Sequence, residues 1–129
     1  MAAGIPSASH LLGAIAGHLS EHVLDKLAGH DAFNLRVAIN AVRIAEREAA
    51  LSPALDAAEA QRLAGLLGRT GPLAAQNAEL CRRIRNGDIS HADPALRAHL
   101  LVTALGKLSI DNPKYATYLR AKAGARSLP

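Results

Sequence analysis

The segment from Asp93 to Ile110 decides the fold class, and it reads DPALRAHLLVTALGKLSI. Asp93 is a typical helix N-cap, and Pro94 suits the first helical position, where its missing backbone N–H costs nothing. The rest of the segment is rich in Ala and Leu, which favour helices. The segment therefore predicts a helix that begins at Asp93–Pro94 and ends near Ile110.

The composition of the whole chain extends this prediction. Ala supplies 28 and Leu 20 of the 129 residues, while aromatic residues make up 2% and Trp is absent. Few β-branched and aromatic residues argue against a β-sandwich or barrel, and a chain that is half hydrophobic and 20% charged is not disordered. We predict an all-α fold: one domain over residues 1–129, a compact bundle of five to six helices.

Helix start and stop signals divide the chain. Ser7 is the expected N-cap of the first helix, which ends before Gly29, and Gly13 and Gly17 permit close helix approach within it. Its expected apolar stripe consists of Leu12, Ile15, Leu19, Val23 and Leu27.

Five further helices follow by the same signals. They are expected from Asp31 to about Leu51, from the cap-plus-proline pair Ser52–Pro53 to Gly68, from Leu73 to Asn86–Gly87, from Asp93 to about Ile110, and from Asn112–Pro113 to about Ala121. Residues 122–129 are expected to form a frayed tail.

The second predicted helix has apolar residues on two sides, Phe33 and Val37 among them, so we expect it to be the central helix of the bundle. A narrow polar arc remains, formed by Arg36, Asn40, Arg43 and Arg47. Because Arg forks pair well with phosphate and carboxylate, this arc is a candidate for contact with an anion or an acidic partner. The alternative is a solvated face, or internal salt bridges to Glu46 or Glu48.

The fifth predicted helix has an apolar face that is too wide for a peripheral helix. It contains the run from Leu100 to Leu105 and then Leu108. Either this helix is buried on two sides, or part of the face meets another chain, which could be a second copy in a homodimer.

One motif has the spacing of a metal site. His18, Glu21 and His22 form an H-x-x-E-H pattern, in which two His four residues apart can hold Zn²⁺ and the Glu can act as a base. A small zinc-dependent hydrolase is therefore an alternative function. The other interpretation is two solvent-facing His residues, and we assign no catalytic residue, metal or cofactor.

Two further polar residues need an interpretation. Cys81 is the only cysteine, which excludes a disulfide framework, and we expect a small buried hydrophobe rather than a nucleophile, since the sequence brings no His base close to it. Asn77 shares a helix face with Leu80 and Ile84, so we expect it to point inward and to make a structural hydrogen bond in the core.

Charge is unevenly distributed. Residues 1–65 carry a net charge of −2 and residues 66–129 a net charge of +6. A homodimeric module that binds nucleic acid through this basic half is a further alternative, but Arg82, Arg83 and Arg85 point around their helix and stacking aromatics are nearly absent. We therefore expect no nucleic-acid partner.

No apolar run is long enough for a membrane span and no signal peptide is recognisable, so we expect a cytoplasmic protein.

Three segments resemble a bacterial family of short helical proteins of unassigned function. They are residues 34–42 (NLRVAINAV), 77–87 (NAELCRRIRNG) and 107–115 (KLSIDNPKY). The similarity runs in the same order from about Ser9 to Leu119.

The resemblance implies a role. Members of this family are similar to the small partner subunit of an aminoglycoside-phosphotransferase-like kinase, which phosphorylates 4-hydroxyacyl-CoA substrates in levulinate-type catabolism beside an acyl-CoA dehydrogenase-like enzyme. The implied function is a non-catalytic accessory subunit that supports the kinase. The resemblance carries no catalytic residues, and the His18–His22 pattern is not part of it.

Overall fold

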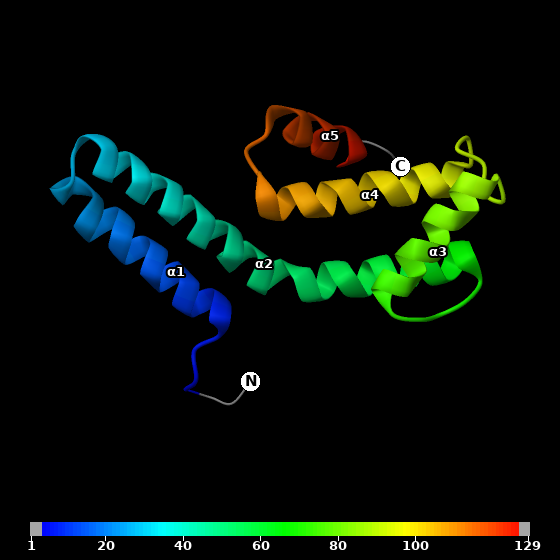
Figure 1. The fold of residues 1–129 in the computed structure, drawn as a ribbon, viewed down its shortest axis with the longest axis horizontal. Helices are drawn as coiled ribbons and strands as arrows, with labels where there is room; N and C mark the ends of the chain where they lie inside the picture. The colour runs from blue at the N-terminus through cyan, green and yellow to red at the C-terminus, as the bar shows by residue number, and fades with distance from the viewer. Residues whose placement is uncertain (1–3, 127–129) are drawn as a thin grey trace. The chain divides into compact units, whose positions relative to one another are not determined.

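The structure, a computed structural model, describes residues 4–126 and is all-α, as predicted. Within these residues there are five α-helices and no strand (Figure 1). The helices are α1 (Ala8–His18), α2 (Gly29–Leu67), α3 (Leu73–Asn86), α4 (Pro94–Asp111) and α5 (Ala116–Arg126).

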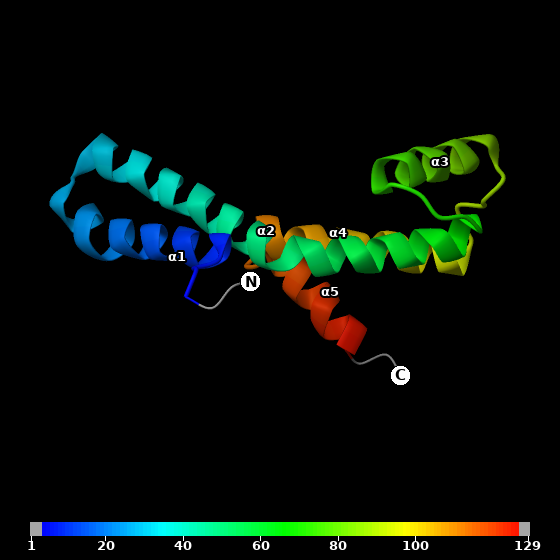
Figure 2. The same ribbon diagram turned by 90° about the horizontal axis from the view of Figure 1, so that it is seen from below.

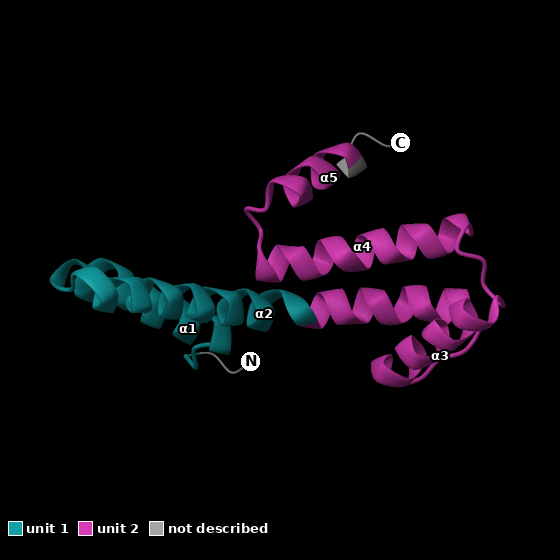
Figure 3. Ribbon diagram, turned by 45° about the horizontal axis from the view of Figure 1, so that its top comes forward, with its two compact units in different colours: residues 1–52 teal, residues 53–129 magenta. Residues whose placement is uncertain are grey.

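Two compact units make up the chain, residues 1–52 and residues 53–129 (Figure 3). The first contains α1 and the first half of α2, and the second contains the other half of α2 with α3, α4 and α5. The single domain over residues 1–129 stays a prediction, and each unit is described by itself below.

In the first unit, α1 lies alongside the first half of α2 (Figure 2). Ser7 is the N-cap of α1, as predicted, because its hydroxyl accepts a hydrogen bond from the backbone N–H of His10. Gly13 permits the expected close approach: a Cβ added there would lie 2.8 Å from Oε1 of Glu46 on α2. Gly17, by contrast, faces open space.

The predicted apolar stripe of the first helix is only partly correct. Ala16 is fully buried, whereas Ile15 is 50% exposed. The small residues Gly13 and Ala16, three apart, form the contact face, and this turns Ile15 toward solvent. After His18 the backbone changes to a π-helix (Leu19–Val23) and a 3₁₀ turn (Leu24–Lys26), so the 3.6-residue period does not reach Leu27.

The predicted break at Ser52–Pro53 is wrong, because α2 continues through Pro53 as one helix of 39 residues. Proline removes one backbone hydrogen bond, the one to the carbonyl of Ala49, but its φ angle is close to helical. The residues that follow are rich in Ala and Leu and favour the helix on the far side.

The first half of α2 is also not encircled by apolar contacts. Phe33 is 58% and Val37 54% exposed, while Ala32 is buried. Within its unit this half has one neighbouring helix, α1, which covers one face only (Figure 2). The prediction of a central helix is therefore wrong for residues 29–52.

The second unit contains the main hydrophobic core. Four buried leucines from α2, α3 and α4 meet there, with Leu73, Ile84 and Ile89 packed against them: Leu63, Leu67, Leu80 and Leu96. The predicted helix ends around this core are confirmed. Asp93 Oδ1 accepts hydrogen bonds from the backbone N–H groups of Ala95 and Leu96, and Gly87 has the left-handed φ of +80° that ends α3.

The last helix begins later and runs further than expected. Asn112 is the C-cap of α4 and not an N-cap, because its backbone N–H donates to the carbonyl of Leu108. A turn follows, and α5 then runs from Ala116 past the expected end at Ala121 to Arg126, so that residues 122–126 of the expected tail are helical. Its Tyr118 is only 6% exposed, and the ammonium of Lys122 lies 5.8 Å from the ring centroid. The remaining tail residues, 127–129, lie outside the described part of the chain.

No helix in residues 4–126 combines the length and the apolar character that crossing a membrane requires.

Candidate ligand-binding site

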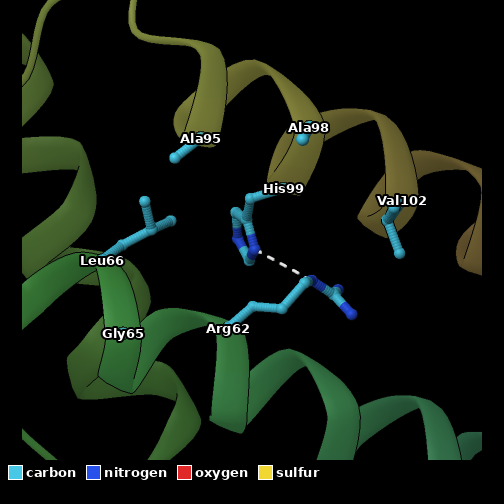
Figure 4. A pocket seen from close by; sticks show the side chains of 7 residues that line it. All are labelled: Arg62, Gly65, Leu66, Ala95, Ala98, His99 and Val102. Atoms are coloured by element: carbon cyan, nitrogen blue, oxygen red, sulfur yellow. Dashed lines mark hydrogen bonds between the residues drawn. The ribbon is translucent and has the colours of Figure 1, made fainter.

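A cavity of about 390 Å³ lies in the second unit between α2 and α4 (Figure 4). From α2 it is lined by Arg62, Gly65 and Leu66, and from α4 by Ala95, Ala98, His99 and Val102. These residues line the cavity together because they lie three or four positions apart along each helix and therefore share one helix face. Small side chains on both helices leave the space open.

His99 is the central polar residue of this cavity. It is only 3% exposed, and its ring extends from α4 into the space between the two helices (Figure 4). Arg62 Nε donates to His99 Nδ1 over 3.1 Å. Since Arg is always a donor, Nδ1 must be unprotonated, and the neutral ring therefore carries its proton on Nε2.

The surroundings of His99 keep it neutral. Burial lowers the pKa of His99, the positive charge of Arg62 lowers it further, and the carboxylate of Glu59 acts in the opposite direction with a smaller effect. At neutral pH the imidazole is therefore a fixed hydrogen-bond donor at Nε2 rather than a cation.

Arg62 is held in place by the same network. Its second terminal nitrogen donates to Thr103 Oγ1 over 3.1 Å, one turn after His99 on α4. The guanidinium has five N–H bonds, so the bonds to His99 and Thr103 leave three free. Among the described residues no carboxylate lies within ion-pair distance of Arg62.

The predicted cationic arc lies elsewhere, in the first unit. Arg36 and Asn40 are exposed, as expected of a surface that meets a partner or solvent. Arg43 donates to Glu46 over 3.0 Å within the same helix, so for this residue the internal salt bridge is present. Arg47 is half-buried. The role of the arc in binding an anion or partner stays a prediction.

The predicted H-x-x-E-H residues lie where α1 passes into the π-helix. His18, Glu21 and His22 are all exposed, and the two imidazole rings are 5.4 Å apart between centroids. Within residues 4–126 no group of three or more His, Cys, Asp or Glu residues is arranged to hold a metal ion.

The buried amide of α3 is Gln76, one residue before the expected Asn77. Gln76 is 2% exposed; its Nε2 donates to the carbonyl of Arg69 over 2.6 Å, and its Oε1 accepts from Arg69 Nε over 2.9 Å. This pair fixes the turn between α2 and α3. Asn77 is half-buried and donates a longer bond of 3.4 Å to Glu59, so its structural hydrogen bond is at the edge of the core.

The expectation for Cys81 is wrong, because this cysteine is exposed. Its helix turns the neighbouring Leu80 into the core, and a residue one position further along is rotated by about 100° toward solvent.

Two arginines of the basic half form ion pairs with Glu79 within α3. Glu79 binds both Arg82 and Arg83, and these hydrogen bonds lower its pKa from 4.5 to about 2. Arg83 also donates to the carbonyl of Leu67, the last residue of α2, over 2.9 Å. These arginines therefore hold α3 together and tie it to α2, which is a structural role.

Neither Arg62 nor His99 is among the site residues predicted from the sequence. The sequence does contain a signal for His99. This residue lies inside an apolar run of α4, and a polar residue buried there needs a hydrogen-bond partner. The partner is 37 residues away along the chain, and only the pairing of α2 with α4 shows it.

Comparison with known protein families identifies the family of this chain. A family model described as "Domain of unknown function (DUF6285)" matches residues 25–115. The chain belongs to the DUF6285 family. The DUF6285 region includes all three segments that carry the resemblance noted above, and it covers every residue that lines the cavity.

No curated protein and no solved structure matches the chain significantly.

Proposed function

We propose that this DUF6285 protein is a non-catalytic accessory subunit that docks on a phosphotransferase-like kinase acting on hydroxyacyl-CoA substrates. We infer the class of partner from the resemblance of three segments to the small partner subunit of such an enzyme. These segments are residues 34–42, 77–87 and 107–115. The observation that best supports docking is the apolar face of α4.

Part of this apolar face of α4 is exposed to solvent and is accessible to a partner. Leu100, Leu101 and Val102 are each between 47% and 49% exposed, although their neighbours Leu96 and His99 are buried. Three consecutive large apolar side chains, about 100° apart around the helix, leave a broad exposed apolar surface on α4, and such surfaces mark protein–protein contacts. Leu101 would be an apolar anchor, since the chain has few aromatic residues for this role.

The test is co-expression with an aminoglycoside-phosphotransferase-like kinase that acts on hydroxyacyl-CoA substrates. We expect the two to co-purify and the kinase to turn over hydroxyacyl-CoA faster in the complex. Leu101→Lys should abolish co-purification, because it places a charge in the apolar contact. Leu119→Lys on α5 is the matched control, because Leu119 has the same exposure (50%) on another helix.

Failure to co-purify, together with unchanged kinase turnover without this protein, would overturn the proposal. A dimer of this chain in light scattering that Leu101→Lys converts to a monomer would assign the α4 face to a homodimer instead.

A further inference from the structure

The cavity between α2 and α4 has the features of a small-molecule site, independently of any kinase. Its volume of about 390 Å³ falls in the range of ligand pockets, which are mostly apolar with a few placed polar groups. Leu66, Ala98 and Val102 supply the apolar wall, and Arg62 and His99 supply the polar groups.

His99 gives the first indication of a ligand. Its Nδ1 is used by Arg62, and no hydrogen-bond partner of Nε2 lies among the described residues. No fully buried side-chain nitrogen or oxygen in this part of the chain lacks a partner, so Nε2 must reach the open space of the cavity. A residue that is 97% buried thus directs one free N–H donor into the pocket.

Arg62 gives the second indication. It carries a full positive charge at the cavity wall, it has three N–H bonds left for a ligand, and its orientation is already fixed by His99 and Thr103. A guanidinium held in this way is suited to a planar carboxylate.

The charge of the pocket distinguishes between anions. Arg62 contributes a single positive charge, His99 is neutral, and the carboxylate of Glu59 is near enough to act on the His99 ring. A dianion such as a phosphate monoester would bring two negative charges to the single cation Arg62, whereas a monocarboxylate brings one. Arg62 alone therefore matches the charge of a monocarboxylate better than that of a dianion.

We propose that this cavity binds a small aliphatic monocarboxylate, with its carboxylate on Arg62, its chain against Leu66, Ala98 and Val102, and the Nε2–H of His99 free to donate to a polar atom of the ligand. The site shares Val102 with the exposed α4 surface proposed above for docking, but it is tested on this protein alone and does not require the accessory role.

The experiment titrates the full-length protein with hexanoate and follows amide ¹H–¹⁵N spectra. We expect saturable shifts centred on Gly65, Ala98 and Val102. Hexan-1-ol should bind more weakly than hexanoate because it lacks the charge, and inorganic phosphate should not compete.

Two variants test separately the positive charge of Arg62 and the apolar wall of the cavity. Arg62→Gln should weaken hexanoate about tenfold or more, the value of a charge-assisted hydrogen bond, and leave hexan-1-ol nearly unchanged. Ala98→Leu should weaken both ligands, because it fills the cavity. Arg97→Gln is the control: this arginine is exposed on the same helix and donates to the carbonyl of His91, outside the pocket.

Circular dichroism and the melting temperature verify that each variant is folded, and Ala98→Leu provides a second test should Arg62→Gln unfold. Hexanoate shifts that do not saturate or that lie outside the cavity would overturn the proposal. Equal binding by Arg62→Gln and the unsubstituted protein would also overturn it, as would tighter binding of phosphate. Each of these results can occur whether or not the kinase co-purifies.

Discussion

At the scale of single residues, the buried polar groups hold the second unit in one arrangement. Gln76 fixes the turn before α3, and Arg62 and His99 join α2 to α4. Gln76 and His99 are the buried members of these pairs, so removing the partner of either one leaves a buried polar group unsatisfied.

The first prediction concerns the two amides of α3. Gln76→Ala should lower the free energy of unfolding by about 1–3 kcal/mol, because it removes a buried side chain with two hydrogen bonds to Arg69. Asn77→Ala should cost about 0.5 kcal/mol or less, since Asn77 is half-buried and its bond is long. Urea denaturation measures both, and equal losses would contradict the assignment of Gln76 as the core amide.

A second residue-scale prediction follows from the lowered pKa of His99. The folded protein resists protonation of this ring, while in the unfolded chain it takes up a proton near its ordinary pKa of 6.5. The contribution of His99 to the free energy of unfolding is therefore complete above about pH 6.5, and it is lost as the pH falls toward the lower pKa of the folded protein.

Melting temperatures measured across this range should decline on the acid side, and His99→Gln should reduce that decline. The exposed His30 serves as the control, because His30→Gln should leave the profile as it is. A profile that His99→Gln does not change would refute the assignment.

At the scale of helices, α2 is the least expected element. Its 39 residues include Pro53 in the interior, where the sequence predicts a break. We expect Pro53→Ala to raise the free energy of unfolding by up to about 3 kcal/mol, because alanine restores the hydrogen bond to the carbonyl of Ala49 and removes the steric conflict. Chemical denaturation tests this, and a loss of stability would mean that the proline conformation is needed.

The two glycines of α1 offer a matched pair. Gly17→Ala should stabilise by about 0.5–1 kcal/mol, since it improves helix propensity in open space. Gly13→Ala should gain less, because its new Cβ would displace the Glu46 carboxylate from beside Arg43. Thermal melts compare the two, and a larger gain from Gly13→Ala would show that the close contact with Glu46 has no cost.

Local signals predicted the helix ends at Ser7, Gly87 and Asp93 correctly. The cap-plus-proline signal failed at Ser52–Pro53 and at Asn112–Pro113. Ser7, Gly87 and Asp93 act as caps because a cap is made by residues within one turn of it. The break at Pro53 was wrong because the helix propensity on both sides outweighs one lost bond.

Tertiary features could be predicted only in part. The choice between Gln76 and Asn77 depends on a rotation of about 100°, which periodicity alone does not resolve. The cavity depends on which helices pair, and neither composition nor spacing in this sequence determines that.

At the scale of the whole molecule, the two units differ in how much apolar surface they bury. Within the described residues of the first unit, the buried hydrophobic residues are Ala16 and Ala32, whereas the second unit buries four leucines and Tyr118. Regions with few buried contacts open at lower free energy.

Amide hydrogen exchange should therefore be faster in α1 than in α3 and α4, by about tenfold or more at mid-helix positions. Mass spectrometry of peptic fragments reports this directly. Equal protection of α1 and α4 would indicate that the first unit has a partner surface in solution.

The burial of Tyr118 also gives the protein an optical probe of its own. The chain has no Trp and two Tyr, of which Tyr118 is buried under Lys122 and Tyr115 is 47% exposed. In a Tyr115→Phe variant all ultraviolet phenol emission would come from α5. Its quenching by iodide would then show whether α5 leaves α4 before the rest of the chain unfolds, without any attached label.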